Sequence, residues 1–395
     1  MRILVCHNFY QQPGGEDQSF AGEAAMLEAF GHRVVRFTRH NRDIAGRPRL
    51  GAAADTLWNR RVARELAEAV RGQAIDVAHF QNTFPIISPA AYHAVGRLGV
   101  PVVQSLRNYR LLCPNALFYR DGHVCEDCLG RSIPWPGVLH RCYRGSVGAS
   151  AVTAAMLTAH RALGTWSDAV DMYIANTEFS RRKFIEGGLP ADRVAVKPNF
   201  VYPDPGPGAG RGGFALYAGR LTPEKGIATL LAAWKLLGGR LPLRIAGDGP
   251  LAPLVREAAG GPDAVEYLGH RTPLEVSDLM GDASVLVFPS EWYETFGRTI
   301  VEAFAKGTPV VAAALGGVTA MIDPGRTGLH YPPGDAEALA GRVEALLGDP
   351  GMLARMRPEA RREFELCYTA ERNHAMLLEI YGRAVERRRG APAPA

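Results

Sequence analysis

The chain lacks any long hydrophobic run. A membrane-spanning helix needs roughly 18 consecutive apolar residues, and the closest stretch in the 395 residues, Ala149–Leu157, is short and interrupted by Thr153. We also expect no secretory leader, because Arg2–His7 has the pattern of a buried strand, not of a basic segment followed by a long apolar one. We therefore expect the chain to be cytoplasmic.

A strong excess of charge is also missing. The net charge is +5 at pH 7, and the basic residues are not interleaved with aromatic ones. A groove for single-stranded nucleic acid combines both features, so no nucleic-acid partner is expected. The scattered arginines of Arg33–Arg49 and Asn59–Arg61 fit an ordinary solvated surface. Peripheral docking at the inner face of an anionic membrane is the alternative reading.

Cysteine is scarce, with six residues in all, but four of them lie close together in the sequence. The central pair is C-x2-C, and the outer two flank it by about a dozen residues each, so a second C-x2-C is absent. In a cytosolic protein such cysteines favour a structural zinc site or free thiols over disulfides. The four candidate zinc ligands are Cys113, Cys125, Cys128 and Cys142.

Short apolar runs alternate with helical patterns along the whole chain, which is typical of βαβ units with parallel sheets. We predict an α/β protein of two doubly wound, Rossmann-like domains that face each other across a cleft. The domains are residues 1–202, with a cysteine-containing insertion at about 108–147, and residues 214–368; residues 203–213 link them, and 369–395 form a helix that braces the first domain, then a tail. The predicted strands are Arg2–Cys6, Arg33–Thr38, Asp76–Phe80, Val100–Leu106, Met172–Asn176, Val194–Pro198, Phe214–Ala218, Leu243–Ala246, Val265–Leu268, Val285–Pro289 and Pro309–Ala313, with helices between them such as Glu16–Phe30 and Leu57–Arg71.

The linker contains a misleading glycine pattern. Gly208, Gly210 and Gly213 reproduce the G-x-G-x-x-G spacing. A dinucleotide-binding fingerprint follows a strand and opens a helix, whereas these glycines follow prolines and precede a strand. A structural turn is therefore the better interpretation.

The stretch Phe288–Pro333 has the strongest functional signal. An apolar strand runs into an acidic turn that contains glycine, and the turn opens a helix. Free N–H groups and the helix dipole favour an anion there. Glu294 and Glu302, eight residues apart, add carboxylates that can bind hydroxyls. Phosphate and hydroxyls together indicate a sugar nucleotide.

Two further turns could contribute to such a site. In the turn after Phe214–Ala218, Arg220 and Lys225 place two cations where a strand ends and a helix begins, which suits a diphosphate. Near the N-terminus, Gly14 and Gly15 follow the first strand and either bring backbone close to a ligand or form a tight turn.

Taken together, these segments resemble the family 4 glycosyltransferases of the GT-B fold. The resemblance covers nearly the whole chain and is carried by HNFYQQPGGED, AGRLTPEKG, GDGP and, above all, FPS-x3-ETFG-x4-EAFAKGTPVVA, which matches the family's Glu-x7-Glu element. It implies a nucleotide diphosphate sugar, linked to UDP, GDP or dTDP, as the donor substrate, retention of anomeric configuration, and no catalytic metal ion. The donor-binding residues that it implies are Gly14, Gly15, Arg220, Lys225, Glu294, Thr295, Phe296, Gly297 and Glu302.

The chain departs from this family in its first half. Many relatives have a histidine after the fourth strand, where this chain has Arg107. Arg107 either contacts a sugar or an anionic acceptor, or pairs with a carboxylate. With Glu294, Arg220 and Lys225 it completes the predicted catalytic set. Glu16, Asp17, His79 and Arg107 are the candidates on the acceptor side.

The predicted function is a retaining glycosyltransferase that moves a sugar to an acceptor hydroxyl, in the synthesis of a cell-surface polysaccharide or another glycoconjugate. The acceptor would be a glycan, either free or lipid-linked. A sugar-nucleotide 2-epimerase of similar fold is one alternative, although such enzymes lack the Glu-x7-Glu element in this setting. A catalytically degenerate GT-B binding partner is the other.

Overall fold

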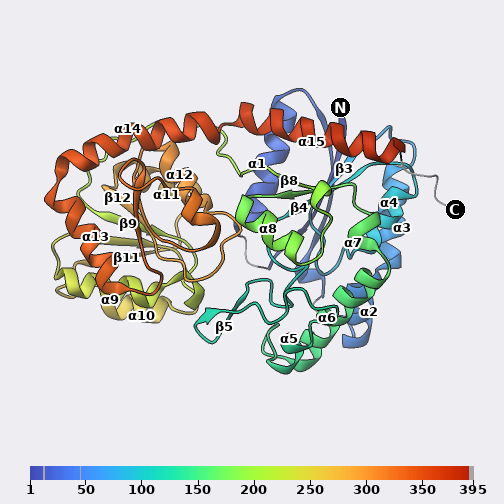
Figure 1. Ribbon diagram of the computed structural model, residues 1–395, viewed down its shortest axis with the longest axis horizontal. Coiled ribbons are helices and arrows are strands. Elements are labelled where there is room, and N and C mark those ends of the chain that lie inside the picture. The colour runs from blue at the N-terminus through green and yellow to red at the C-terminus, as the bar shows by residue number, and fades with distance from the viewer. Residues whose placement is uncertain (12–13, 45, 391–395) are drawn as a thin grey trace. The chain divides into compact units, whose positions relative to one another are not determined.

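A computed structural model of the protein describes residues 1–11, 14–44 and 46–390 (Figure 1). The chain forms two compact units, and each is built on one six-stranded parallel sheet. Unit 1 contains Met1–Phe118, Cys125–Pro198 and the described residues from Asn373 onward, while unit 2 contains Tyr119–Val124 and Asn199–Arg372. The predicted pair of Rossmann-like domains is thereby confirmed.

The sheet of unit 1 has the strand order β2-β1-β3-β4-β7-β8, and every neighbouring pair is parallel. The order reverses direction between β1 and β3. Its strands are β1 (Arg2–Phe9), β2 (Arg33–His40), β3 (Val77–Asn82), β4 (Val102–Leu106), β7 (Met172–Ala175) and β8 (Val194–Val196). Its helices are α1 (Gly15–Ala29), α2 (Arg49–Trp58), α3 (Arg60–Val70), α4 (Ala90–Gly96), α5 (Trp135–Leu139), α6 (Val147–Ala162), α7 (Thr165–Asp168) and α8 (Glu178–Glu186).

The sheet of unit 2 has the order β11-β10-β9-β12-β13-β14, again all parallel. Here the reversal lies between β9 and β12. The strands are β9 (Ala215–Ala218), β10 (Leu243–Ala246), β11 (Val265–Gly269), β12 (Val285–Phe288), β13 (Val310–Ala313) and β14 (Gly328–Tyr331). The helices are α9 (Ile227–Leu237), α10 (Ala252–Ala258), α11 (Pro273–Asp282), α12 (Arg298–Ala305), α13 (Ala336–Gly348) and α14 (Pro350–Cys367).

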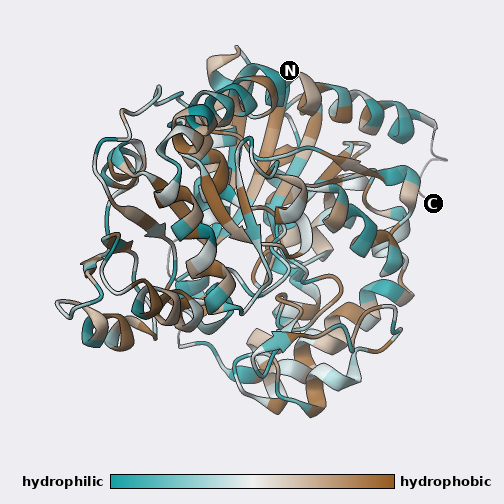
Figure 2. Cartoon of the chain, turned by 60° about the vertical axis from the view of Figure 1, so that its left-hand side comes forward, coloured by the Kyte–Doolittle hydropathy of each residue, from teal (hydrophilic) through white to brown (hydrophobic). Residues whose placement is uncertain are grey.

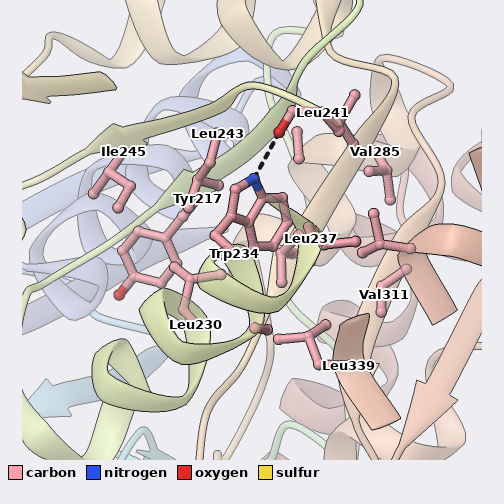
Figure 3. Close-up of a cluster of buried hydrophobic side chains, with 14 of the residues drawn as sticks. Tyr217, Leu230, Trp234, Leu237, Leu241, Leu243, Ile245, Val285, Val311 and Leu339 are labelled. Carbon is pink, nitrogen blue, oxygen red and sulfur yellow. Dashed lines mark hydrogen bonds between the residues drawn. The ribbon is translucent and has the colours of Figure 1, made fainter. Parts of the chain in front are cut away.

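Two hydrophobic clusters cover the opposite faces of the unit 2 sheet. Alternate residues of a strand point to opposite faces, so Tyr217 packs in one cluster and Leu216 in the other. Trp234 of α9 is fully buried in the first cluster, and its Nε1 donates a hydrogen bond of 2.8 Å to the carbonyl oxygen of Leu241 (Figure 3). Packing on both faces makes the sheet a rigid scaffold, and functional residues are expected in the loops at its edge.

The distribution of hydropathy follows these layers, with hydrophobic residues along the central strands, while the helices around them carry both hydrophobic and hydrophilic residues (Figure 2). Within the described part of the chain, no helix combines the length and the apolar composition that a membrane span needs.

The structure corrects one predicted helix and adds three strands. Leu57–Arg71 is not continuous, because Asn59 ends α2 and its side chain accepts a hydrogen bond from the Val62 amide at the start of α3. The strand β14 was not predicted. Neither was the two-stranded antiparallel sheet of β5 (Tyr119–Arg120) and β6 (His123–Val124).

The last helix, α15 (Ala370–Gly390), makes several polar contacts with unit 1. The Tyr381 hydroxyl lies 2.8 Å from Nδ1 of His79 in β3. Nearer the helix end, Arg388 donates to Asp171. From Asn373 onward the final helix therefore belongs to the first unit, although it follows the second in sequence.

Candidate active site

The candidate site of unit 2 lies at the carboxyl ends of β9 and β12. These neighbouring strands pair in parallel, with Leu216 opposite Leu286. The chain order reverses direction between them, and open parallel sheets bind ligands at such a switch point. Of the sequence-predicted donor residues of unit 2, all but Glu302 lie in the loops that leave these two strands, and Glu302 lies in α12, the helix that follows the second loop.

A glycine contact brings the two loops together. Gly226 follows the short 3-10 turn Pro223–Lys225 with φ of 68°, a conformation that favours glycine. A Cβ atom at this position would lie 1.9 Å from the carbonyl oxygen of Pro289, directly after β12. Only a residue without a side chain allows this approach, and the approach carries Lys225 to the loop that follows β12.

Lys225 and Glu294 form a close ion pair. Nζ of Lys225 lies 2.5 Å from Oε1 of Glu294, and the same oxygen accepts a 2.8 Å hydrogen bond from Oγ of Ser290. The two side chains are 18% and 7% exposed. Lys225 also lies over the ring of Trp292, 5.2 Å from its centroid. Ser290 and Trp292 were not predicted from the sequence.

The start of α12 holds the second predicted glutamate. Gly297 precedes the helix without a side-chain cap, and Thr295 and Phe296 are buried just before it. Glu302 accepts a hydrogen bond of 2.7 Å from Nε of Arg298 one turn earlier, and both side chains are about a quarter exposed. Glu294 therefore lies in the loop and pairs with Lys225, while Glu302 lies in the helix and pairs with Arg298.

Arg220 lies in the turn after β9 and is much more exposed. Its side chain is 58% accessible, and Nη2 lies 3.7 Å from Oε1 of Glu224. Backbone contacts tie the turn to the next loop, since the Glu291 amide donates to the Glu224 carbonyl at 2.9 Å. An exposed guanidinium on an anchored turn can reach an anionic ligand.

In unit 1, the described residues after β1 make side-chain hydrogen bonds around the start of α1. The Gly14 amide donates to Oδ2 of Asp17 at 3.1 Å. Oδ1 of Asp17 lies 2.7 Å from Nε2 of His7, which is fully buried. Glu16 bonds to Asn108 and to Tyr10. A Cβ atom on Gly14 or Gly15 would meet nothing within 4 Å, so the glycines border open space. Gln12 and Pro13 of the predicted motif lie outside the described residues.

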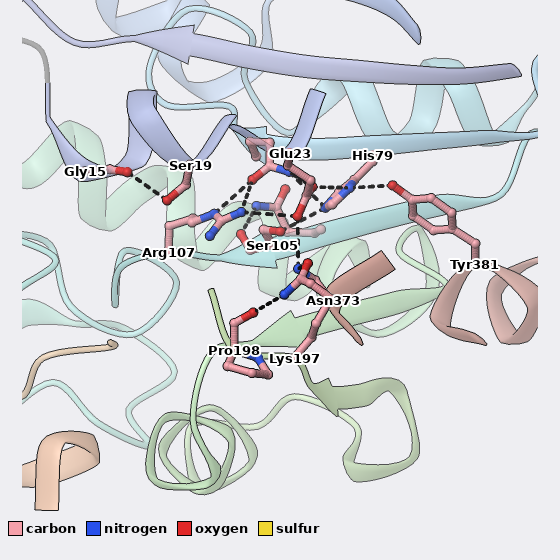
Figure 4. A network of polar contacts seen from close by, with 12 residues as sticks. Gly15, Ser19, Glu23, His79, Ser105, Arg107, Lys197, Pro198, Asn373 and Tyr381 are labelled. Atoms are coloured by element: carbon pink, nitrogen blue, oxygen red, sulfur yellow. Dashed lines mark hydrogen bonds and ion pairs between the residues drawn. The ribbon is translucent and has the colours of Figure 1, made fainter. Parts of the chain in front are cut away.

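Arg107 follows β4 directly and is buried, with 8% exposure (Figure 4). Nε and Nη2 donate to Oε1 of Gln81 at 2.9 and 2.7 Å, and Nη2 lies 3.6 Å from Oε2 of Glu23. Of the two predicted roles, pairing with a carboxylate is the one that this geometry shows.

His79 is in the middle of β3, not at its end. Its Nδ1 lies 3.1 Å from Oε1 of Glu23, and its Nε2 lies 2.8 Å from the Ser105 hydroxyl. Burial lowers the pKa of His79 despite the nearby carboxylate. Glu23 also accepts a 3.0 Å bond from Lys197. Burial opposes ionisation of Glu23, but Lys197, His79 and Arg107 hold its pKa well below the ordinary value.

This buried network was not visible in the sequence. Glu23 is on the inner face of α1 and Lys197 follows β8, 174 residues away. The only local signal is a charged residue within a mostly apolar helix face, which is common on solvated helices as well.

The four clustered cysteines all lie in the segment between β4 and β7. Burial raises the pKa of Cys128 to about 12, and the thiols of Cys113, Cys142 and Cys125 add to this effect. They are thus close neighbours. Across the described ranges, however, no group of three or more His, Cys, Asp or Glu side chains is arranged to hold a metal ion. The predicted zinc site finds no support in this geometry.

Comparisons with known proteins agree with this architecture. A family model described as glycosyl transferase 4-like domain matches residues 14–199, and one described as glycosyl transferases group 1 matches residues 208–363. The D-inositol 3-phosphate glycosyltransferase of Kineococcus radiotolerans is 33% identical over 262 residues, which are 56% of this chain and 59% of that protein. The glycogen synthase of Mycobacterium tuberculosis is 35% identical over 153 residues, or 37% of each chain. The chain thus spans 37% and 59% of the lengths of these two curated relatives.

Solved structures share the fold over nearly the whole chain. HepE of Anabaena, in complex with UDP and glucose, has a TM-score of 0.69 at 19% identity and covers 97% of this chain and 99% of its own. Sucrose-phosphate synthase of Thermosynechococcus elongatus has a TM-score of 0.70 at 18% identity, with 97% and 98% covered. At this identity the likeness shows the fold alone.

Two parallel-sheet domains with these neighbours define a protein of the GT-B type. More narrowly, with both family models matched in order along its sequence, the chain belongs to the glycosyltransferase family 4-like proteins.

Proposed function

We propose that this protein transfers a sugar from a nucleotide diphosphate sugar to an acceptor hydroxyl. The observation that carries the proposal is the Lys225–Glu294 pair at the switch point of the unit 2 sheet, with Arg220 and the start of α12 beside it. The family models support it, and so do relatives named as glycosyltransferases. A nucleotide-sugar donor is further supported by the solved HepE complexes with UDP and with UDP-glucose.

Each side chain has a proposed role that follows from its charge. Arg220 and Lys225 hold the donor diphosphate, with the first turn of α12 as a further source of positive potential. Glu294 accepts hydrogen bonds from hydroxyls of the transferred sugar. Glu302 does the same for the nucleotide ribose.

The chemical step is electrostatic. As the bond between sugar and phosphate breaks, negative charge grows on the diphosphate, and the two cations stabilise it more in the transition state than in the bound donor. We propose retention of anomeric configuration, with the leaving phosphate oxygen accepting the proton of the attacking hydroxyl. This step is proposed to need no metal ion.

The acceptor is proposed to be a glycan, free or lipid-linked, of a cell-surface polysaccharide or another glycoconjugate, and the protein is proposed to be cytoplasmic. Glu16 and Asp17 are the acceptor-side candidates at the start of α1. Arg107 and His79 are held by Gln81, Glu23 and Ser105. We therefore propose that these two position the loops around them.

A panel of UDP-, GDP- and dTDP-sugars tests the proposal by donor hydrolysis, followed chromatographically. Hydrolysis of one donor that is lost in Glu294→Ala and in Lys225→Ala supports the transferase. The matched control is Glu266→Ala, which removes an exposed carboxylate paired with Arg244 elsewhere in unit 2. Binding without turnover of any donor, with or without glycan acceptors, would instead favour a binding partner, and an epimerised sugar nucleotide would favour an epimerase. Once an acceptor is known, the carbon–proton coupling constant at the anomeric carbon of the product shows whether the anomeric configuration of the donor is retained.

A further inference from the structure

The segment between β4 and β7 of unit 1 exposes an apolar groove that the proposed reaction does not use. The groove encloses about 750 Å³ between α5 and α6. Ile133, Trp135, Leu139 and Val147 line it and are 57%, 52%, 64% and 49% exposed. Exposed apolar side chains that gather in one place mark an interaction surface more often than a solvated one.

The charged side chains of the stretch that contains α5 and α6 have one sign. From Arg131 to Arg161 the chain has four arginines, the other two being Arg141 and Arg144, and no aspartate or glutamate. Arg131 lies over the ring of Trp135, 5.5 Å from its centroid, while Arg141 and Arg144 are exposed. Arg161 is different, because it donates to backbone carbonyls of Arg131 and Ser132 and so braces the segment.

Several arginines elsewhere on unit 1 are paired with carboxylates. On β2 and the helices after it, Arg36 pairs with Glu28 and Arg39 with Glu65. In the same region, Arg47 lies 2.9 Å from Asp55. The face that the sequence suggested for anionic lipid thus has arginines that pair with carboxylates, whereas residues 131–161 contain no carboxylate to offset their arginines, so the α5–α6 segment is the better basic surface.

We propose that the α5–α6 groove docks the protein on the surface of an anionic phospholipid bilayer. Trp135, Leu139 and Ile133 enter the boundary between headgroups and acyl chains, where tryptophan is favoured because one end of its ring system is polar. Arg141 and Arg144 contact lipid phosphates, and the apolar stem of each arginine lies along the groove. The groove itself accommodates acyl-chain carbons.

A second copy of the chain fits this surface less well. In a two-fold dimer the same patch faces itself, so the arginines of both copies would be brought together without an acidic partner within residues 131–161. Like charges across an interface oppose association. An anionic bilayer supplies the missing negative charge and the apolar interior at once.

Co-sedimentation of the full chain with vesicles tests the proposal. We expect binding to vesicles of phosphatidylglycerol and phosphatidylcholine in equal parts, and at least tenfold weaker binding to phosphatidylcholine alone. Each arginine near an anionic surface contributes about fivefold in affinity, so R141E/R144E should weaken binding by about 25-fold or more, and W135S/L139S should abolish it. The matched controls should bind normally: R182E/R362E exchanges two exposed arginines, and Leu274→Ser replaces a leucine that is 72% exposed in unit 2.

Tryptophan fluorescence provides a second readout that does not depend on loss of binding. Of the five tryptophans, Trp135 is the one classed as exposed, so anionic vesicles should shift its emission to the blue and protect it from acrylamide. The shift should vanish in Trp135→Phe. Equal binding to charged and uncharged vesicles, normal binding of R141E/R144E, or concentration-dependent dimers that W135S/L139S disrupts would each overturn the proposal.

Discussion

The ion pair of Lys225 and Glu294 should make separable contributions to stability and to function. Glu294→Leu leaves a lysine that is 18% exposed beside a newly apolar neighbour, and Lys225→Met leaves a carboxylate that is 7% exposed. Replacing both side chains removes both charges at once. We therefore expect the double variant to be folded but inactive.

The magnitudes follow from burial. Removing one partner of a fully buried pair costs about 3–5 kcal/mol, and replacing both by apolar residues is often close to neutral. Because Lys225 keeps some contact with solvent, each single variant should lose about 2–3 kcal/mol of unfolding free energy, at or just below the lower end of that range. The double variant should stay within about 1 kcal/mol of the wild type, which is a coupling energy of a few kcal/mol.

Urea unfolding, followed by tryptophan fluorescence, measures the free energy of unfolding, and donor hydrolysis measures the effect on function. All three variants should lose at least about 100-fold in hydrolysis, since each removes a charge that acts on the donor. Stability losses that simply add in the double variant would show that the two side chains do not interact. Near-normal hydrolysis in any of the three would refute the proposed role of the pair.

Two further predictions concern stability. Gly226→Ala places a Cβ atom 1.9 Å from the Pro289 carbonyl oxygen at a φ of 68° and should lower the free energy of unfolding in urea by about 2–4 kcal/mol. The control Gly22→Ala in α1, where a Cβ atom meets nothing within 4 Å, should raise it by up to about 1 kcal/mol. Equal effects of the two substitutions would contradict the close approach at Gly226. Burial lowers the pKa of His79, and Glu23, despite its burial, is held well below its ordinary pKa by its cationic neighbours. The unfolded chain therefore binds these protons more readily, so thermal stability should decline as the pH falls below about 6.5 and again below about 4.3, and a melting temperature that rises on acidification would contradict this.

Most of the fold could be predicted because it follows from local pattern. The alternation of apolar runs and helices located β10 at Leu243–Ala246 without error and placed β9 and β12 to within one residue at one end. The strand β14 escaped because Gly328–Tyr331 is short and contains a histidine and a glycine. The pattern of a four-residue strand with polar members cannot be told from that of a loop.

The donor-binding part of the candidate site could also be predicted from the sequence, because strand, turn and helix follow one another within a few residues. The contacts in unit 1 could not be predicted. Arg107 contacts Gln81, 26 residues earlier, and lies near Glu23 in α1. Such distant partners depend on the order of the strands in the sheet, and the spacing of residues along the sequence does not reveal that order.

Hydrogen–deuterium exchange in the presence of UDP and of the donor identified by the hydrolysis panel tests the central claim most directly. The account predicts slowed exchange in the two loops that leave β9 and β12, residues 219–226 and 289–302, with the larger effect for the complete donor because its sugar contacts Glu294. Leu230–Leu237 of α9, which packs Trp234 and Leu237 into the core of unit 2, serves as the internal reference. Donor binding that leaves both loops unprotected, or that protects only unit 1, would contradict the placement of the donor site.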